Sequence, residues 1–83
     1  MNRQVGARRS SYVTLQVTAL RRLGKQIQTL REERRLTQDA LARRVGLSRA
    51  YLARLEIGRH NAPILTLAKI AKALKVPITD LLA

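Results

Sequence analysis

Cysteine, tryptophan and phenylalanine are absent from this chain of 83 residues, and Tyr12 and Tyr51 are its only tyrosines. Without cysteine, the chain can form neither a disulfide scaffold nor a cysteine-based zinc finger. With so few aromatic rings, it cannot stack bases as single-strand binders and RNA-recognition sheets do. These absences already exclude several classes of small domain.

Acidic residues are also scarce, because 5 Asp and Glu stand against 17 Lys and Arg and give a net charge of +12. Hydrophobic residues make up 46% of the chain, which argues against a disordered basic tail. We expect one small domain, since the chain has no room for two cores. The partners of a folded chain with this charge are expected among nucleic acids, anionic membranes and acidic proteins.

Long apolar runs are lacking too, because charged residues interrupt them, and no transmembrane helix is expected. Residues 1–17 are too polar for the core of a signal peptide. Their arginines, and the lack of any acid before Glu32, also fit a transit peptide, which is the alternative to a soluble cytoplasmic protein. We expect the cytoplasmic protein.

Residues 1–18 are predicted to form a basic N-terminal arm or a loosely ordered extension, followed by a folded domain of residues 19–83. Residues 1–31 hold seven basic residues and no acid. The alternation of Val13, Leu15 and Val17 fits either a short strand or an early extension of the next helix.

Helical spacing of apolar residues predicts the first helix over residues 19–34, where Gly24 is either a mild cost or a close packing point. The residues that set this spacing are Leu20, Leu23, Ile27 and Leu30. A fourth helix is predicted after a polar loop, capped by Asn61 and ended by Val76-Pro77, and a short fifth helix runs through Leu82.

Two short helices are predicted between them, over residues 38–45 and 49–57. Thr37 and Ser48 are their predicted N-caps, while Gly46 and Gly58 end them. Two short helices joined by a tight turn that contains glycine are typical of a helix-turn-helix.

The second of these short helices has two distinct faces. Leu52 and Leu55 are expected in the core, while Arg49, Ala50, Ala53 and Arg54 point the other way. Small side chains let a helix enter the major groove, arginine can bond guanine, and Ala50 could meet a thymine methyl group. The alternative is a solvated face that carries two arginines.

The segment from Leu36 to Gly58 resembles the helix-turn-helix domain of the phage repressor and Cro family, also called the xenobiotic-response-element family. The matching residues are Thr37-Gln38, Leu41-Ala42, Gly46-Leu47-Ser48, Leu55-Glu56-x-Gly58 and the run from Thr66 to Leu74. The resemblance covers about residues 20–83 and implies an all-α, compact five-helix domain of the lambda-repressor type. It also implies a sequence-specific transcriptional regulator, a repressor, that binds a palindromic double-stranded DNA operator as a homodimer.

Residue roles follow from this resemblance. The base-contacting positions would be Ser48, Arg49, Ala50 and Arg54. The phosphate-contacting positions would be Gln38, which also braces the recognition helix, and Arg43, Tyr51 and Arg59. Arg43 and Arg59 could instead be solvated, and Tyr51 could pack against the preceding helix. Arg31 and Glu56 match a structural ion pair of the family.

Further interpretations concern the two ends of the chain. One interpretation of the N-terminal end is an arm that reaches DNA through Arg3, Arg8 and Arg9, and the alternative is a disordered end. Ile78, Leu81 and Leu82 are candidates for the dimer interface, unless they pack onto the core of their own protomer.

Three other functions compete with operator binding. An antitoxin or coactivator-type module would bind a partner protein, and a restriction-modification controller would also bind DNA. A membrane-surface peptide fits poorly with five capped segments. We expect no enzyme and no cofactor or metal, because the single histidine, His60, lies in a loop and the five acids are scattered.

Overall fold

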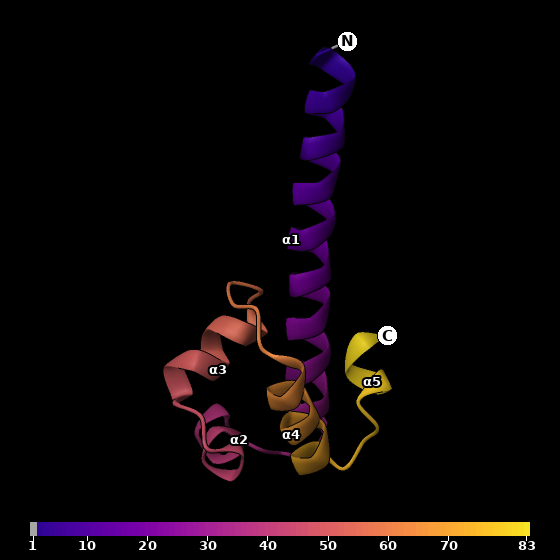
Figure 1. The fold of residues 1–83 in the computed structure, drawn as a ribbon. Helices are drawn as coiled ribbons and strands as arrows, with labels where there is room; N and C mark the ends of the chain where they lie inside the picture. Colours follow the sequence, from indigo (N-terminus) through magenta and orange to yellow (C-terminus); the bar gives the residue numbers. More distant parts are fainter. Residues whose placement is uncertain (1) are drawn as a thin grey trace.

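The computed structural model describes the backbone of residues 2–83 and the side chains of residues 12–83. Within this part the chain folds into five α-helices and no strand (Figure 1). They are α1 (Asn2–Glu33), α2 (Gln38–Val45), α3 (Arg49–Glu56), α4 (Ile64–Leu74) and α5 (Thr79–Leu82). The four shorter helices gather around the C-terminal half of α1, whose N-terminal half rises above them (Figure 1). The predicted all-α, five-helix fold is confirmed.

The start of α1 differs from the prediction. The loosely ordered extension is wrong for residues 2–18, because they continue α1 upstream of residue 19, and the alternative of an early helical extension is confirmed. A strand would need a partner strand, and the described residues contain none. A helix that packing has nucleated instead gains one hydrogen bond for each residue added. The side chains of Arg3, Arg8 and Arg9 lie outside the described residues, so their role at DNA stays a prediction.

Apolar side chains from every helix meet in one core. Those with at most 1% exposure and the largest volumes are Ile27, Leu41, Leu52, Leu55, Ile70, Leu74 and Leu81. Burying each such side chain contributes roughly 1.5–3 kcal/mol. The predicted periodicity of α1 and α4 is therefore confirmed by the residues that each helix buries.

Gly24 lies where α1 crosses the C-terminal end of α3. A Cβ atom at Gly24 would collide with the backbone carbonyl oxygens of Leu55 and Glu56, so this glycine is a close packing point. Gly58, just beyond α3, has a φ of +77°, and a Cβ atom there would lie 2.8 Å from Cγ of Arg21. These two glycines let α3 end directly against α1.

The predicted capping of α4 by Asn61 is wrong. Pro63 occupies the N-cap position, no side chain caps the helix, and the backbone carbonyl of Pro63 accepts from the Leu67 N–H at 3.1 Å. The helix ends at Leu74, one turn before Pro77 could interrupt it, because Lys75 adopts the left-handed conformation with a φ of 59°.

α5 packs against α1, where the Gln26 side-chain amide donates to the backbone carbonyl of Asp80 at 2.9 Å. The dimer prediction is wrong for Leu81, which is 1% exposed in the core of its own chain. Ile78 also packs against that core, so of the three predicted residues only Leu82 is largely exposed. None of the helices in the described part of the chain is long and apolar enough to span a membrane.

Candidate nucleic-acid interface

The turn between α2 and α3 is built by three consecutive residues. Gly46 takes a φ of 82° at the end of α2, where its N–H and that of Leu47 both donate to the carbonyl of Ala42. Ser48 then caps α3 by accepting from the Tyr51 N–H at 3.0 Å. The left-handed conformation is readily available to glycine alone, so Gly46 permits the tight reversal that sets α3 against α2.

α3 presents a buried side and an exposed side, as predicted. Leu52 and Leu55 are fully buried, whereas Arg49, Ala50 and Arg54 are exposed. In the described part of the chain, neither arginine is within ion-pair distance of a carboxylate. Both guanidinium groups are therefore free to bind a ligand from solvent, and Ala50 between them adds little bulk.

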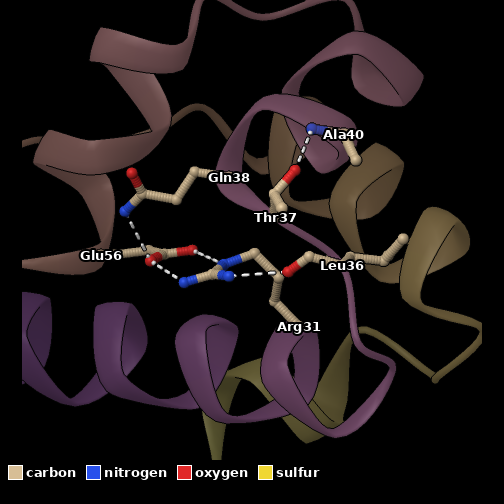
Figure 2. Close-up of polar contacts among 6 residues, drawn as sticks. All are labelled: Arg31, Leu36, Thr37, Gln38, Ala40 and Glu56. Carbon is tan, nitrogen blue, oxygen red and sulfur yellow. Dashed lines mark hydrogen bonds and ion pairs between the residues drawn. The ribbon is translucent and has the colours of Figure 1, made fainter.

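A buried ion pair fixes the base of α3 to α1 (Figure 2). The Arg31 guanidinium donates from Nε to Oε2 of Glu56 at 2.7 Å and from Nη2 to Oε1 at 3.0 Å, while its Nη1 donates to the carbonyl of Leu36 at 2.7 Å. The residues are 8% and 5% exposed. The predicted structural pair is confirmed, and it removes the only acid of α3 from the exposed side of that helix.

Gln38 joins this pair from the first turn of α2. Its side-chain amide donates to Oε1 of Glu56 at 3.0 Å, and Thr37 caps the same helix by accepting from the Ala40 N–H at 3.0 Å (Figure 2). The predicted bracing of the recognition helix by Gln38 is confirmed. Its predicted contact with phosphate stays a prediction.

The same hydrogen bonds stabilise the protonated form of Arg31. Its hydrogen bond to Glu56 raises the pKa of Arg31 above its usual value against the opposing effect of burial, and the charges of Glu56 and Glu32 raise it further. The guanidinium thus stays positively charged, and its role is to bind Glu56 within the fold.

The remaining predicted phosphate contacts have different surroundings. Arg43 pairs with Asp39 on α2 at 3.0 Å, and both side chains are exposed, so this pair is expected to yield easily to a phosphate. Arg59 is exposed directly after α3 and has no carboxylate partner among the described residues. Two arginines, one on α2 and one in the loop beyond α3, therefore flank the predicted base-contacting positions.

His60, in the loop after α3, packs on the edge of the candidate interface. Its ring lies 4.4 Å from that of Tyr51, centroid to centroid, at an interplanar angle of 73°. Tyr51 is also partly buried against the core. Its predicted packing against α2 and its predicted phosphate contact both stay predictions. No sequence pattern pairs these two residues, because the contact depends on how the loop turns back over α3.

A shallow depression of about 600 Å³ lies beside the N-terminus of α2. Its lining consists of Arg31, Thr37, Gln38, Asp39 and Arg49. Helix N-termini attract anions through free N–H groups and the helix dipole, so a phosphate at this depression would meet the positive end of α2 and the side chain of Arg49.

The exposed, cation-flanked α3, set against α2 by a three-residue turn, defines a helix-turn-helix DNA-binding unit. A family model described as helix-turn-helix matches residues 27–81, more than half of the chain. The chain belongs to this helix-turn-helix family, which confirms the resemblance to phage repressors.

Similar proteins include regulators from bacteria and phages. The chain is 42% identical over 57 residues to the immunity repressor protein of Bacillus phage phi105 and 43% identical over 60 residues to the HTH-type transcriptional repressor RghR of Bacillus subtilis (strain 168). These matches cover 69% and 71% of this chain but only 40% and 44% of those proteins. The chain therefore spans less than half the length of these two relatives.

A solved structure is similar over nearly its whole length. The restriction-modification controller protein C.AhdI from Aeromonas hydrophila superposes with a TM-score of 0.73 at 32% identity, over 75% of this chain and 94% of that one. Three quarters of this chain thus share the architecture of almost the whole of that protein.

Proposed function

We propose that this protein is a transcriptional regulator that binds a specific double-stranded DNA operator and represses transcription. The exposed face of α3 carries the proposal, because Arg49 and Arg54 are free of carboxylate partners and stand on a helix whose other side is locked into the core. Membership of the helix-turn-helix family, and relatives that are named as repressors, support it. We expect the protein to act in the cytoplasm, because its proposed function requires access to DNA.

The proposed interface makes two kinds of contact with DNA. Arg49 and Arg54, together with Ser48 and Ala50, face the major groove and read base edges. The second set, Gln38, Arg43, Tyr51 and Arg59, holds phosphates and sets the position of α3 along the groove. The buried Glu56 keeps negative charge away from that surface, because Arg31 and Gln38 both bind it.

A homodimer on a palindromic operator completes the proposal. One α3 of 8 residues reaches only a few base pairs. Two copies that place their recognition helices about one helical turn apart would read both half-sites, and the combined contacts would supply the affinity.

Selection of bound sites from a random pool of duplexes tests this function. Arg49→Ala and Arg54→Ala should each relax the preference at particular base pairs and cost about 1–3 kcal/mol on the selected site. Arg59→Ala should weaken binding to all duplexes alike and lower the slope of log affinity against log salt by about 0.9. Lys25→Ala, which removes an exposed cation from α1, is the matched control and should leave base preference unchanged. Binding without preference for any selected sequence would refute operator recognition.

A controller of restriction and modification genes is the second candidate. The likeness to C.AhdI covers 94% of that protein, whereas the repressors named above are matched over less than half of theirs. Both candidates bind DNA, so the position of the selected sites in the genome would distinguish them.

A further inference from the structure

A second cationic surface lies where the end of α2 packs against α4 (Figure 1). A depression of about 460 Å³ opens at this point, and we call it the basic groove. Its lining consists of Arg44, Val45, Lys69, Lys72, Ala73 and Lys75. None of these residues is among the predicted DNA contacts, so operator binding leaves the groove without a role.

Four cations and no acid line the basic groove. All four are exposed, and in the described part of the chain none is within ion-pair distance of a carboxylate. They are Arg44, Lys69, Lys72 and Lys75. Clefts lined by one sign of charge focus the electric field and concentrate ligands of the opposite sign. The groove is therefore expected to attract an anionic ligand.

The cations reach the groove from two helices. Lys69 and Lys72 are three residues apart on α4, so they lie on the same face of that helix. Arg44 lies about 100° around α2 from Arg43, so it does not share the face of that proposed phosphate contact. The helix dipole accounts for Lys72 in the last turn of α4 but not for Lys69 in the middle of the helix. Helix stability alone thus does not explain the cluster.

Lys75 occupies a position where glycine would cost less free energy. It ends α4 in the left-handed conformation with a φ of 59°, and its N–H donates to the carbonyl of Lys72 at 3.1 Å. Helices commonly end with a glycine in this conformation. Strained backbone positions cluster at functional sites, where the side chain has a use. A ligand that binds the Lys75 ammonium group would supply such a use.

The floor of the basic groove is apolar. Val45 and Ala73 line it, and both are partly buried against the core. An adjoining depression of about 250 Å³ shares Ala73 with the groove and adds Leu36, which is also partly buried. An apolar floor between exposed cations fits a ligand that carries apolar groups between anionic ones.

We propose that the basic groove binds an acidic segment of a partner protein. Carboxylates of that segment pair with Arg44, Lys72 and Lys75, and an apolar side chain between them rests on Val45 and Ala73. The site uses no residue assigned to DNA, so the proposal does not rest on operator recognition.

The apolar floor favours a polypeptide over a second nucleic acid. A duplex carries its phosphates on a convex, rigid surface, so it would contact the exposed cations and leave Val45 and Ala73 uncovered. A second copy of this chain also fits poorly. Its 5 acids include one adjacent pair, Glu32-Glu33, and arginines stand on both sides of that pair.

Fluorescence anisotropy of the whole chain with a labelled peptide tests the groove. The probe is a short peptide in which glutamates alternate with leucines, at physiological ionic strength. Lys72→Glu should raise its dissociation constant at least about tenfold, because like charges then meet in the complex. Lys25→Glu is the matched control, since it makes the same reversal at an exposed position of α1 that does not line the groove. Salt screens such a charge, so the constant should change less than about twofold.

A second variant excludes misfolding as the cause. Lys75→Gly removes one cation and relieves the left-handed strain, so the fold should gain stability while the dissociation constant rises about two- to fivefold. Lys25→Ala also removes one cation and should leave peptide binding unchanged. A probe with serine in place of each leucine should bind the wild-type chain at least about threefold more weakly, because it leaves the floor uncovered.

Three results would overturn the proposal. Equal effects of Lys72→Glu and Lys25→Glu would mean that net charge alone attracts the probe. Equal binding of the leucine and serine probes would mean that the apolar floor has no part. A duplex of random sequence that loses as much affinity as the peptide does on Lys72→Glu would make the groove a nucleic-acid site.

The groove and operator recognition can fail separately. If the peptide does not bind the groove but Arg49→Ala alters base preference, operator recognition stands and the groove is refuted. If Lys72→Glu and Lys75→Gly weaken peptide binding but no duplex is preferred, the groove stands and the proposed function is refuted.

Discussion

Replacement of Glu56 by glutamine probes the buried contact on which the orientation of α3 depends. Three donors converge on its carboxylate, namely Nε and Nη2 of Arg31 and Nε2 of Gln38. A glutamine side chain keeps the shape but offers one oxygen, and its NH₂ group would face another donor. Arg31 would keep its contact with the carbonyl of Leu36 but lose the opposing charge in a site where both residues are less than 10% exposed.

The expected loss of stability is large for a domain of this size. Breaking a buried pair by removing one partner costs roughly 3–5 kcal/mol, out of a total of about 5–15 kcal/mol for a typical domain. For a chain of this length, such a loss lowers Tm by about 12 °C or more. Urea unfolding followed by far-UV circular dichroism measures the free energy directly.

Two controls make the interpretation specific. Glu33→Gln removes the same charge from an exposed position, whose only ion pair among the described residues is a 3.9 Å contact with Arg34. It should change the free energy of unfolding by less than about 0.5 kcal/mol. The double variant Arg31→Met with Glu56→Leu removes both charges, so it should be more stable than Glu56→Gln alone. A loss below about 1 kcal/mol for Glu56→Gln, or a double variant that is less stable still, would refute the picture of a dry, coupled pair.

Two backbone positions give predictions of opposite sign. Gly24→Ala should lower the free energy of unfolding by about 1–3 kcal/mol, because the added Cβ atom meets the carbonyls of Leu55 and Glu56. This loss is expected although alanine favours helix more than glycine does. A gain in stability in urea unfolding would contradict the close crossing of α1 and α3. Lys75→Gly should raise the free energy of unfolding by up to about 1 kcal/mol, because glycine adopts the left-handed conformation at a φ of 59° without strain. Thermal melts that show a clear loss of stability would mean that the lysine side chain itself contributes to the fold.

Much of the local structure was predictable from the sequence, because it depends on neighbours within one or two turns. The caps Thr37 and Ser48, the left-handed Gly46 and the buried Leu52 and Leu55 all follow from short-range patterns. These features also define the exposed face of α3. The predicted DNA contacts themselves rest on the family resemblance and await the binding experiments.

The errors in the prediction have a different origin. The sequence of residues 2–18 lacks a clear helical pattern, and these residues are helical because they extend a helix that packing stabilises further along the chain. The edge-to-face contact of Tyr51 with His60 depends on how the loop turns back over α3, and the burial of Leu81 needs segments that are distant in sequence to come together.

The sequence alone determined a basic, cysteine-free chain of helices, with side-chain caps on α2 and α3 and two arginines on one exposed helical face. Only the tertiary structure decided which side chains are held by partners within the chain and which remain exposed to solvent. It shows that Gly24 is required for the approach of α1 to α3, that Leu81 belongs to the core, and that Tyr12 and Leu15 of α1 stay exposed. The physical reason is the sequence separation of the interactions involved. Capping and periodicity depend on residues a few positions apart, whereas burial depends on how helices distant in sequence pack.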